Sequence, residues 1–193
     1  MEYNFDWDYF DNPTSKSGYQ GYYYDYTGEG EQLPWKAVAR YIKNNLCSGS
    51  VLDIGCAKGY LVFEAEQIGL KAFGYDISTY AIQHAISRNC IVKDICHGIH
   101  KKFDVIVALG TLIYIEENKI DKVLKNIFDY AGNYFVFSAY FQGGKQNVKD
   151  KQRKITKTKL WWIRKIMKAG FRLYEEKEWG IVFYTVKENR TDV

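Results

Sequence analysis

The chain has 193 residues, a formal net charge of +4 and 47% hydrophobic residues, which suits a single domain with a substantial core. No apolar run approaches the roughly 20 residues that a membrane-spanning helix needs, and the acidic, aromatic start lacks the basic and apolar regions of a secretion signal. The four cysteines show no disulfide-framework spacing, so we expect a cytoplasmic protein with reduced thiols.

Residues 1–32 form an acidic, tyrosine-rich segment, which we separate from a folded domain at 33–193. Five of the eight residues from 19 to 26 are tyrosines, and residues 1–31 carry seven acids against one lysine. Because this aromatic richness argues against simple disorder, we interpret the segment as a lid that folds over a bound ligand and excludes water. A partly disordered tail and an aromatic cover on a sheet edge are the alternatives.

Apolar periodicity and turn residues divide the rest of the chain into alternating helices and strands. Helices are expected at 34–46, 59–68, 79–88, 118–130 and 159–168, and strands at 51–55, 71–75, 90–92, 103–109, 134–140, 171–175 and 181–186. We expect Gly132 to end the fourth helix. The alternation favours a parallel sheet with right-handed crossovers. The last two strands, joined through Trp179 and Gly180, look like an antiparallel hairpin.

The stretch Val51–Gly59 is the most informative in the chain. A short apolar run leads to the acid Asp53 and then to Ile54. Two glycines, Gly55 and Gly59, follow four residues apart. This pattern predicts a buried strand that leads through a tight turn into a helix, with glycines where the backbone takes positive φ or approaches something closely. Such a turn at the carboxyl end of a sheet forms a nucleotide-type pocket. A turn that serves packing alone is the alternative.

This stretch resembles the first motif of class I S-adenosylmethionine-dependent methyltransferases. The resemblance continues at Gly74–Ser78, where an acid closes a second strand, and at Phe103–Leu109, and it covers residues 35–140. It implies an α/β fold with a Rossmann-like, doubly wound, mostly parallel seven-stranded sheet that ends in an antiparallel hairpin. It also implies S-adenosylmethionine as the cofactor and leaves the methyl acceptor open.

By the same resemblance, three carboxylates and the glycine turn hold the cofactor. Asp53 faces the ammonium of its methionine part, Asp76 accepts hydrogen bonds from the ribose hydroxyls, and Asp94 accepts from the adenine amino group. The other cofactor contacts that we expect are Tyr22, Tyr24, Gly55, Cys56, Ala57, Gly59, Ile77, Ile95 and Leu109. Many family members carry glycine where Ala57 stands, so alanine should narrow the pocket slightly. The alternatives are a helix-capping role for Asp76 and a simple turn role for Asp94.

Tyr114 follows the fourth strand, where the acceptor is expected to meet the methyl group. Many small-molecule relatives carry histidine near this position and this chain does not, so Tyr114 is our catalytic candidate, either orienting the acceptor or taking its proton. An unperturbed pKa of about 10 makes tyrosine a poor base unless shifted, and simple packing is the alternative. We expect the floor of the acceptor site to be formed by Ser138, Tyr140 and Phe141, at the end of the fifth strand.

Cysteine and histidine residues between positions 90 and 100 invite comparison with zinc sites. Cys90, Cys96, His97 and His100 match no common structural zinc spacing. Cys90 begins a strand, where a buried thiol serves as a small apolar group. We therefore expect no metal, and we expect the two histidines on a surface loop or at the border of the substrate cleft.

Residues 142–170 carry ten lysines and arginines against the single acid Asp150. This asymmetry favours an anionic substrate or partner nearby, and a solvated surface is the alternative. We therefore expect a small acceptor with a phosphate or sugar group, methylated on oxygen or nitrogen, with neither a membrane nor a nucleic acid as partner.

Three other functions compete with this hypothesis. The first is an RNA or protein methyltransferase that docks through residues 142–170. The second is a methyltransferase-like binding module without catalysis. A nicotinamide-dependent enzyme is the third, and it is disfavoured because Gly55–Tyr60 lacks the third glycine of the dinucleotide motif.

Overall fold

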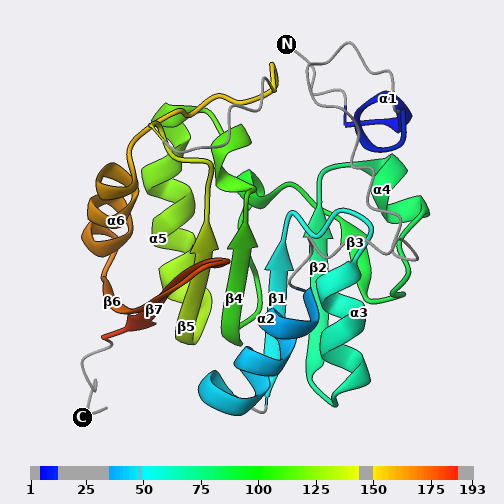
Figure 1. The fold of residues 1–193 in the computed structure, drawn as a ribbon, viewed down its shortest axis with the longest axis horizontal. Helices are drawn as coiled ribbons and strands as arrows, with labels where there is room; N and C mark the ends of the chain where they lie inside the picture. Colours follow the sequence, from blue (N-terminus) through cyan, green and yellow to red (C-terminus); the bar gives the residue numbers. More distant parts are fainter. Residues whose placement is uncertain (1–4, 13–34, 48, 144–149, 187–193) are drawn as a thin grey trace.

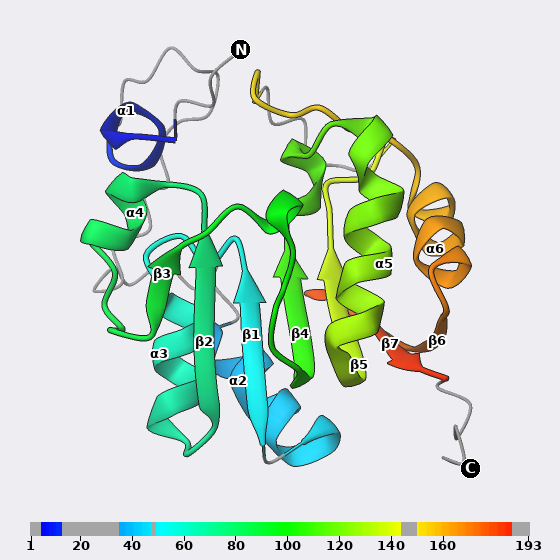
Figure 2. The ribbon, with the colours of Figure 1, turned by 180° about the vertical axis from the view of Figure 1, so that it is seen from behind.

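Seven strands form one mixed sheet with helices on both faces (Figures 1 and 2). The computed structural model describes residues 5–12, 35–47, 49–143 and 150–186. The strands are β1 (Ser50–Ile54), β2 (Lys71–Asp76), β3 (Cys90–Val92), β4 (Phe103–Leu109), β5 (Ala131–Ser138), β6 (Phe171–Lys177) and β7 (Gly180–Thr185). The α-helices are α1 (Trp7–Phe10), α2 (Trp35–Tyr41), α3 (Tyr60–Gln67), α4 (Thr79–Gln83), α5 (Ile120–Tyr130) and α6 (Lys159–Lys168), and shorter turns are η1 (Ile42–Leu46), η2 (Ile95–His97), η3 (Leu112–Tyr114) and η4 (Glu117–Lys119). Within the described ranges, no helix is both long and apolar enough to cross a membrane.

The strand order is β3-β2-β1-β4-β5-β7-β6. The strands from β3 to β5 run parallel, and β7 runs antiparallel to both β5 and β6. The predicted Rossmann-like sheet with its terminal antiparallel hairpin is therefore confirmed. Because β1 lies between β2 and β4, the connections leaving its two neighbours diverge above its carboxyl end, where α/β sheets bind ligands.

Two predicted helices differ from the structure by more than two residues at one end. The helix expected at 79–88 ends at Gln83, because the chain turns back and the backbone N–H of Ile86 donates to the Lys58 carbonyl at 3.0 Å. The helix expected at 34–46 divides into α2 and the π-helical turn η1, whose end is marked by a 2.9 Å bond from the Cys47 N–H to the Ile42 carbonyl.

The prediction that Gly132 ends a helix was wrong. α5 already ends at Tyr130, and Gly132 is the second residue of β5. A Cβ at this position would lie 3.2 Å from both the Asp104 Cα and the Phe103 carbonyl oxygen. The glycine therefore lets β5 approach β4 closely, where the register between the two strands shifts.

The two faces of the sheet carry separate apolar layers, because alternate side chains of a strand point to opposite faces. Leu52 of β1 lies in the layer under α5 and α6, whereas Val51 lies in the layer under α2 and α3. Trp162 of α6 is fully buried against Phe137 of β5, with 5.0 Å between the ring centroids. The same alternation directs Asp53, two residues beyond Val51, toward the α2 and α3 side.

We predict that Trp162→Ala lowers the free energy of unfolding by about 3–5 kcal/mol, because it leaves a large cavity in the layer under α6. Leu160→Ala, on the same helix but 53% exposed, should cost less than about 0.5 kcal/mol. Urea unfolding followed by circular dichroism measures both changes. Similar losses in the two variants would contradict the burial of Trp162.

Candidate functional site

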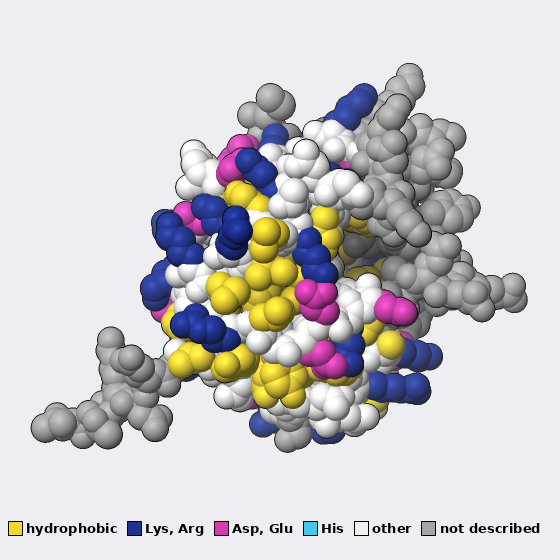
Figure 3. Space-filling view, turned by 60° about the vertical axis from the view of Figure 1, so that its left-hand side comes forward, with side chains coloured by type: hydrophobic (Ala, Val, Ile, Leu, Met, Phe, Trp, Pro, Cys, Tyr) yellow, Lys and Arg dark blue, Asp and Glu magenta, His cyan; other side chains and the backbone are white. Residues whose placement is uncertain are grey.

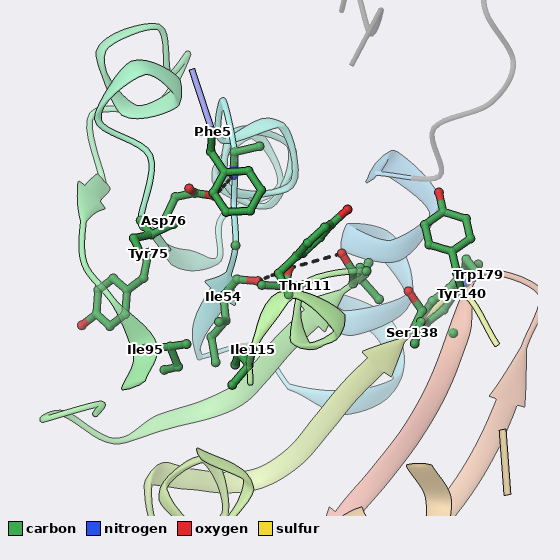
Figure 4. Close-up of a pocket in the computed structure, with 18 of the residues that line it drawn as sticks. Phe5, Ile54, Tyr75, Asp76, Ile95, Thr111, Ile115, Ser138, Tyr140 and Trp179 are labelled. Carbon is green, nitrogen blue, oxygen red and sulfur yellow. Dashed lines mark hydrogen bonds between the residues drawn. The ribbon is translucent and has the colours of Figure 1, made fainter. Parts of the chain in front are cut away.

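A cleft of about 630 Å³ opens at the carboxyl ends of the parallel strands. The ends of β1, β2, β4 and β5 line it together with α1 and the β6–β7 turn. Figure 4 shows Asp76, Tyr75 and Ile95 on one side and Ser138, Tyr140 and Trp179 on the other, with Thr111 between them. The cleft therefore has two ends, here called the Asp76 end and the Tyr140 end.

The glycine turn after β1 forms part of the cleft wall and takes a backbone course that few residues tolerate. Gly55 and Gly59 have φ values of +71° and +76°, and Ala57, at +48°, is the one non-glycine residue with positive φ in the described chain. A Cβ on Gly55 would lie 2.1 Å from the Thr111 hydroxyl oxygen, which donates a 2.9 Å bond to the Ile54 carbonyl. The turn therefore needs glycine at position 55 for conformation and for space.

Asp76 holds the glycine turn from the neighbouring strand. Its Oδ2 accepts a 2.8 Å bond from the Ala57 N–H, and its Oδ1 accepts a 2.8 Å bond from the Ser78 N–H. Burial raises the pKa of Asp76, and the backbone N–H donors oppose that rise. Ser78, rather than Asp76, caps α4, because its hydroxyl accepts from the Ala81 N–H. A carboxylate has about four acceptor sites, so Asp76 keeps acceptor capacity for a ligand in the cleft.

Asp94, Ile77 and Ile95 also line the Asp76 end of the cleft. Asp94 does occupy a turn, since its Oδ1 accepts a 2.8 Å bond from the Cys96 N–H and caps η2. Ile77 is 42% exposed while Ile95 is buried. Two apolar side chains and a carboxylate next to them form a slot with an acceptor at its edge, which fits a flat heterocycle with an amino group.

Asp53 lies beside the cleft rather than in its lining. It borders a small cavity of about 10 Å³ that shares four residues with the large cleft: Trp35, Gly55, Ala57 and Leu109. Burial raises the pKa of Asp53 well above its ordinary value, and the charge of Asp76 adds to this effect. No group in the described ranges donates a hydrogen bond to its carboxylate. A buried carboxylate without a donor is costly and fits a cationic ligand group that reaches this cavity.

The remaining predicted cofactor residues are only partly in the cleft. Leu109 lines both cavities, and Gly59 is the N-cap of α3 behind the turn. Cys56 lines only the small cavity, and its thiol donates to the Ala57 carbonyl at 3.7 Å. Tyr22 and Tyr24 lie outside the described residues.

A buried hydrogen-bond cluster connects Tyr114 to two residues that sequence reasoning did not assign to the site, Tyr9 and Asp150. The Tyr114 hydroxyl donates to Asp150 Oδ2 at 2.7 Å and accepts from the Tyr9 hydroxyl at 2.8 Å. Burial raises the pKa of Tyr114, and the nearby Asp150 charge adds to the rise. These surroundings favour an orienting role over a phenolate base. Asp150 was visible in the sequence only as the one acid of a basic stretch.

Residues 5–12, which contain α1, lie beside α4 (Figures 1 and 2) and form a strap that helps to line the cleft. Phe5, Tyr9 and Phe10 line the cleft from this strap. Asp11 pairs with Lys58 of the glycine turn, and its Oδ2 accepts from the Tyr80 hydroxyl at 2.6 Å. The strap is thus fastened to the glycine turn and α4 through Asp11, and to Tyr114 and Asp150 through Tyr9.

The described part of the basic stretch from residue 150 onward is folded against the Tyr140 end of the cleft rather than extended in solvent. The backbone N–H groups of Lys154 and Ile155 both donate to the Ile113 carbonyl, at 2.8 and 3.0 Å, and Ile155 is buried. Four lysines of this stretch pair with acids elsewhere: Lys154 with Glu116, Lys157 with Glu117, Lys159 with Glu176 and Lys165 with Asp121. Figure 3 shows basic, acidic and apolar side chains interspersed on the face that carries α6 and β6. Arg153 is different: its Nε and Nη2 are buried without a hydrogen-bond partner in the described part of the chain, and its guanidinium lies 4.2 Å from the centre of the Tyr140 ring.

The cysteines and histidines between 90 and 100 are not gathered. Cys90 is buried beside Cys56, while the His97 side chain is 82% exposed. In the described ranges, no group of three or more histidine, cysteine or acidic side chains has the arrangement of a metal site.

Comparison with known proteins yields one family and many similar folds. The model of a family described as a methyltransferase domain matches residues 26–183. No curated protein sequence matches the chain significantly.

Solved structures with low sequence identity share the fold. Magnesium protoporphyrin IX methyltransferase from Synechocystis, with bound SAH (S-adenosylhomocysteine), is 16% identical with a TM-score of 0.65, covering 79% of this chain and 81% of that one. DesVI from Streptomyces venezuelae is 14% identical with a TM-score of 0.65, covering 83% and 94%. A SAM-dependent methyltransferase from Archaeoglobus fulgidus is 20% identical with a TM-score of 0.62, covering 74% and 72%.

We predict that Gly55→Ala lowers the free energy of unfolding by more than about 2 kcal/mol. The alanine would have to adopt a left-handed backbone conformation, and its Cβ would also clash with Thr111. Gly69→Ala is the matched control, with φ of +81° and nothing within 4 Å of its Cβ. Gly69→Ala should lower the free energy of unfolding by only about 1 kcal/mol, which is the cost of the left-handed backbone conformation alone. Equal losses in urea unfolding would contradict the close approach at Gly55.

We predict that Asp53→Asn raises the free energy of unfolding at neutral pH by about 1 kcal/mol, because an amide is less costly to bury than a charge. The raised pKa of Asp53 means that its contribution to stability is fully present below its unfolded pKa of about 4 and is lost as the pH rises through the folded value. Urea unfolding at several pH values should therefore show a flatter profile for the variant. If the stability of the wild type varied with pH in the same way as that of the variant, the burial of an ionisable carboxylate at position 53 would be contradicted. Asp129→Asn, at an exposed ion pair with Lys125, is the control.

Proposed function

The chain belongs to the methyltransferase domain family and is an S-adenosylmethionine-dependent methyltransferase, and from this premise we propose that it methylates an oxygen or nitrogen of a small, anionic acceptor. The observation that carries the proposal is the single cleft with two chemically different ends. One end has carboxylates and an apolar slot, and the other has the aromatic walls of Tyr140, Phe141 and Trp179, with the Arg153 guanidinium against the Tyr140 ring.

We assign the Asp76 end of the cleft to the adenosine part of the cofactor. Asp76 would accept from the ribose hydroxyls, Ile77 and Ile95 would enclose the adenine, and Asp94 would accept from its amino group. The support is that these residues line one wall and that Asp76 has acceptor capacity left after its two backbone bonds. Asp53 would attract the ammonium of the methionine part from the small cavity, and the ammonium would be the partner that this buried carboxylate lacks among the described residues.

The bound cofactor supplies a methyl carbon made electrophilic by the sulfonium, and the protein's contribution is mainly geometric. Alignment of two bound reactants can lower a barrier by about 7–11 kcal/mol. Gly55 and Thr111 keep the floor of the cleft narrow, and the strap covers it with Phe5 and Phe10. Tyr114, which lines the cleft, would orient the acceptor.

A small acceptor with a negative group is the finer part of the proposal. The cleft volume of about 630 Å³ is sufficient for a cofactor and a modest acceptor. Lys93 and Lys119 line the cleft, and Arg153 behind Tyr140 has two guanidinium nitrogens without partners in the described chain. Phosphate or carboxylate is the natural partner of such a group.

The lid hypothesis for residues 1–32 stays a proposal. Its support is that residues 5–12 form a strap with three side chains in the cleft lining. We keep Tyr22 and Tyr24 as proposed cofactor contacts. A cytoplasmic location is also part of the proposal, supported by four free cysteines.

The competing functions find less support. Docking of RNA needs a continuous unpaired basic surface, but four lysines of the basic stretch pair with acids. A binding module without catalysis would not need polar groups at both ends of the cleft.

We predict that Asp76→Ala weakens the binding of S-adenosylhomocysteine at least tenfold, because two hydrogen bonds from the ribose to a carboxylate would be lost. Isothermal titration calorimetry measures both affinities, and circular dichroism confirms that the variant is folded. Asp129→Ala, at an exposed position of α5, should bind as the wild type does. Equal affinity in wild type and Asp76→Ala would refute the ribose assignment.

A further inference from the structure

The Tyr9, Tyr114 and Asp150 cluster has the connectivity of a proton path that leads out of the cleft. Tyr9 and Tyr114 line the cleft, and Asp150, which is buried, does not. The Tyr9 hydroxyl donates to the Tyr114 oxygen at 2.8 Å, and the Tyr114 hydroxyl donates to Asp150 Oδ2 at 2.7 Å. Tyr114 therefore links the cleft to a carboxylate behind the cleft wall.

Tyr9 occupies the position that a hydroxyl on an acceptor molecule would use. A phenol has one donor and two acceptor lone pairs, and Tyr114 uses its donor on Asp150. Any O–H that approaches Tyr114 from the cleft must donate to the Tyr114 oxygen, as Tyr9 does. The Tyr9 hydroxyl also lies 3.3 Å from Asp150 Oδ2. It can therefore still donate a hydrogen bond to that oxygen after another hydroxyl has replaced it on Tyr114.

The surroundings of this position are aromatic. The Phe5 ring lies 4.9 Å from that of Tyr9 and 5.4 Å from that of Tyr114, both in edge-to-face geometry. Tyr140 and Phe141 line the same cleft. Such walls favour a flat ring over a flexible chain, and a ring hydroxyl is also acidic enough to lose its proton during methylation.

We propose, building on the proposed methyltransferase function, that the acceptor is an aromatic hydroxyl compound whose O–H replaces Tyr9 on Tyr114, and that Asp150 is the final acceptor of its proton. As the bond from the acceptor oxygen to the methyl carbon forms, the electron pair of the sulfur–methyl bond returns to sulfur. The O–H bond breaks, its proton passes to the Tyr114 oxygen, and the Tyr114 proton passes to Asp150 Oδ2. Asp150 thus ends protonated and later releases the proton to solvent.

This path assigns separate roles to the three residues. Tyr114 touches the acceptor and is the catalytic residue. Asp150 acts through Tyr114 and is a positioning residue that also stores the proton, with its Oδ1 held by the Gln152 N–H at 2.8 Å. Arg153 is close enough to lower the pKa of Tyr114, although burial and Asp150 outweigh it. The path therefore needs no free tyrosinate at any stage.

The test uses 2-naphthol and its methyl ether, 2-methoxynaphthalene, as probes of the protein saturated with S-adenosylhomocysteine. The wild type should bind 2-naphthol about fivefold more tightly than the ether, which corresponds to one hydrogen bond. Tyr114→Phe should remove this preference, while binding the ether as the wild type does. Tyr9→Phe should bind 2-naphthol at least as tightly as the wild type, because a competing hydroxyl is gone.

A second readout separates proton acceptance from mere structure. Excited 2-naphthol is a strong acid, and it emits as naphtholate where a proton acceptor is within reach. Bound to the wild type it should emit as naphtholate, and bound to Asp150→Asn it should emit mainly as the neutral form, because an amide takes a hydrogen bond without taking the proton. Asp129→Asn, at an exposed ion pair, is the matched control and should resemble the wild type.

Each negative outcome has a distinct meaning. Equal affinity of the wild type for the two probes, no binding of either, or unchanged emission in Asp150→Asn would overturn the proposal. So would a preference for 2-naphthol that survives in Tyr114→Phe. Failure of S-adenosylhomocysteine to bind the wild type in calorimetry would instead refute the proposed function itself.

Discussion

The hydrogen bond from the Ala57 N–H to Asp76 Oδ2 is the interaction on which the site depends. It ties the turn after β1 to the end of β2, and it holds Ala57 at a positive φ that an alanine seldom adopts. With the turn fixed in this way, Gly55 can lie against Thr111 of the next strand connection. The cleft between the diverging ends of β2, β1 and β4 follows from these contacts, and Asp76 contributes both to the wall and to its proposed ligand.

Local signals in the sequence predicted most of the fold. Cys90–Val92 and Phe103–Leu109 are strands with the predicted bounds. For Phe103–Leu109 the reason is that a continuous apolar run between turn residues is typical of a central, buried parallel strand. Gly132 was misassigned because a glycine after a helix normally ends it, whereas here it serves a close approach of two strands that only the folded chain reveals. The end of α4 likewise depends on a bond to Lys58, far away in the sequence.

The residues of the candidate site likewise divide into those that local sequence signals reveal and those that only the folded chain reveals. Asp53, Asp76 and Asp94 were found because each lies at or just beyond the carboxyl end of a strand, and the carboxyl ends of parallel strands meet at one edge. The alternation of side chains then directs Asp53 toward α2 and α3, into the adjoining cavity. Tyr9 and Asp150 were not found, since they reach Tyr114 across separations of 105 and 36 residues. The charge of the basic stretch was also a poor guide on its own, because ion pairs neutralise much of it.

The central claim is that one cleft holds adenosine at the Asp76 end and the acceptor at the Tyr140 end. A crystal structure of the protein with S-adenosylhomocysteine tests it most directly. The account predicts ribose hydroxyls within hydrogen-bond distance of Asp76, adenine between Ile77 and Ile95, and the ligand's sulfur on the side of Tyr114. Density for the ligand elsewhere on the protein, or a reversed ligand with adenine against Tyr140, would contradict it.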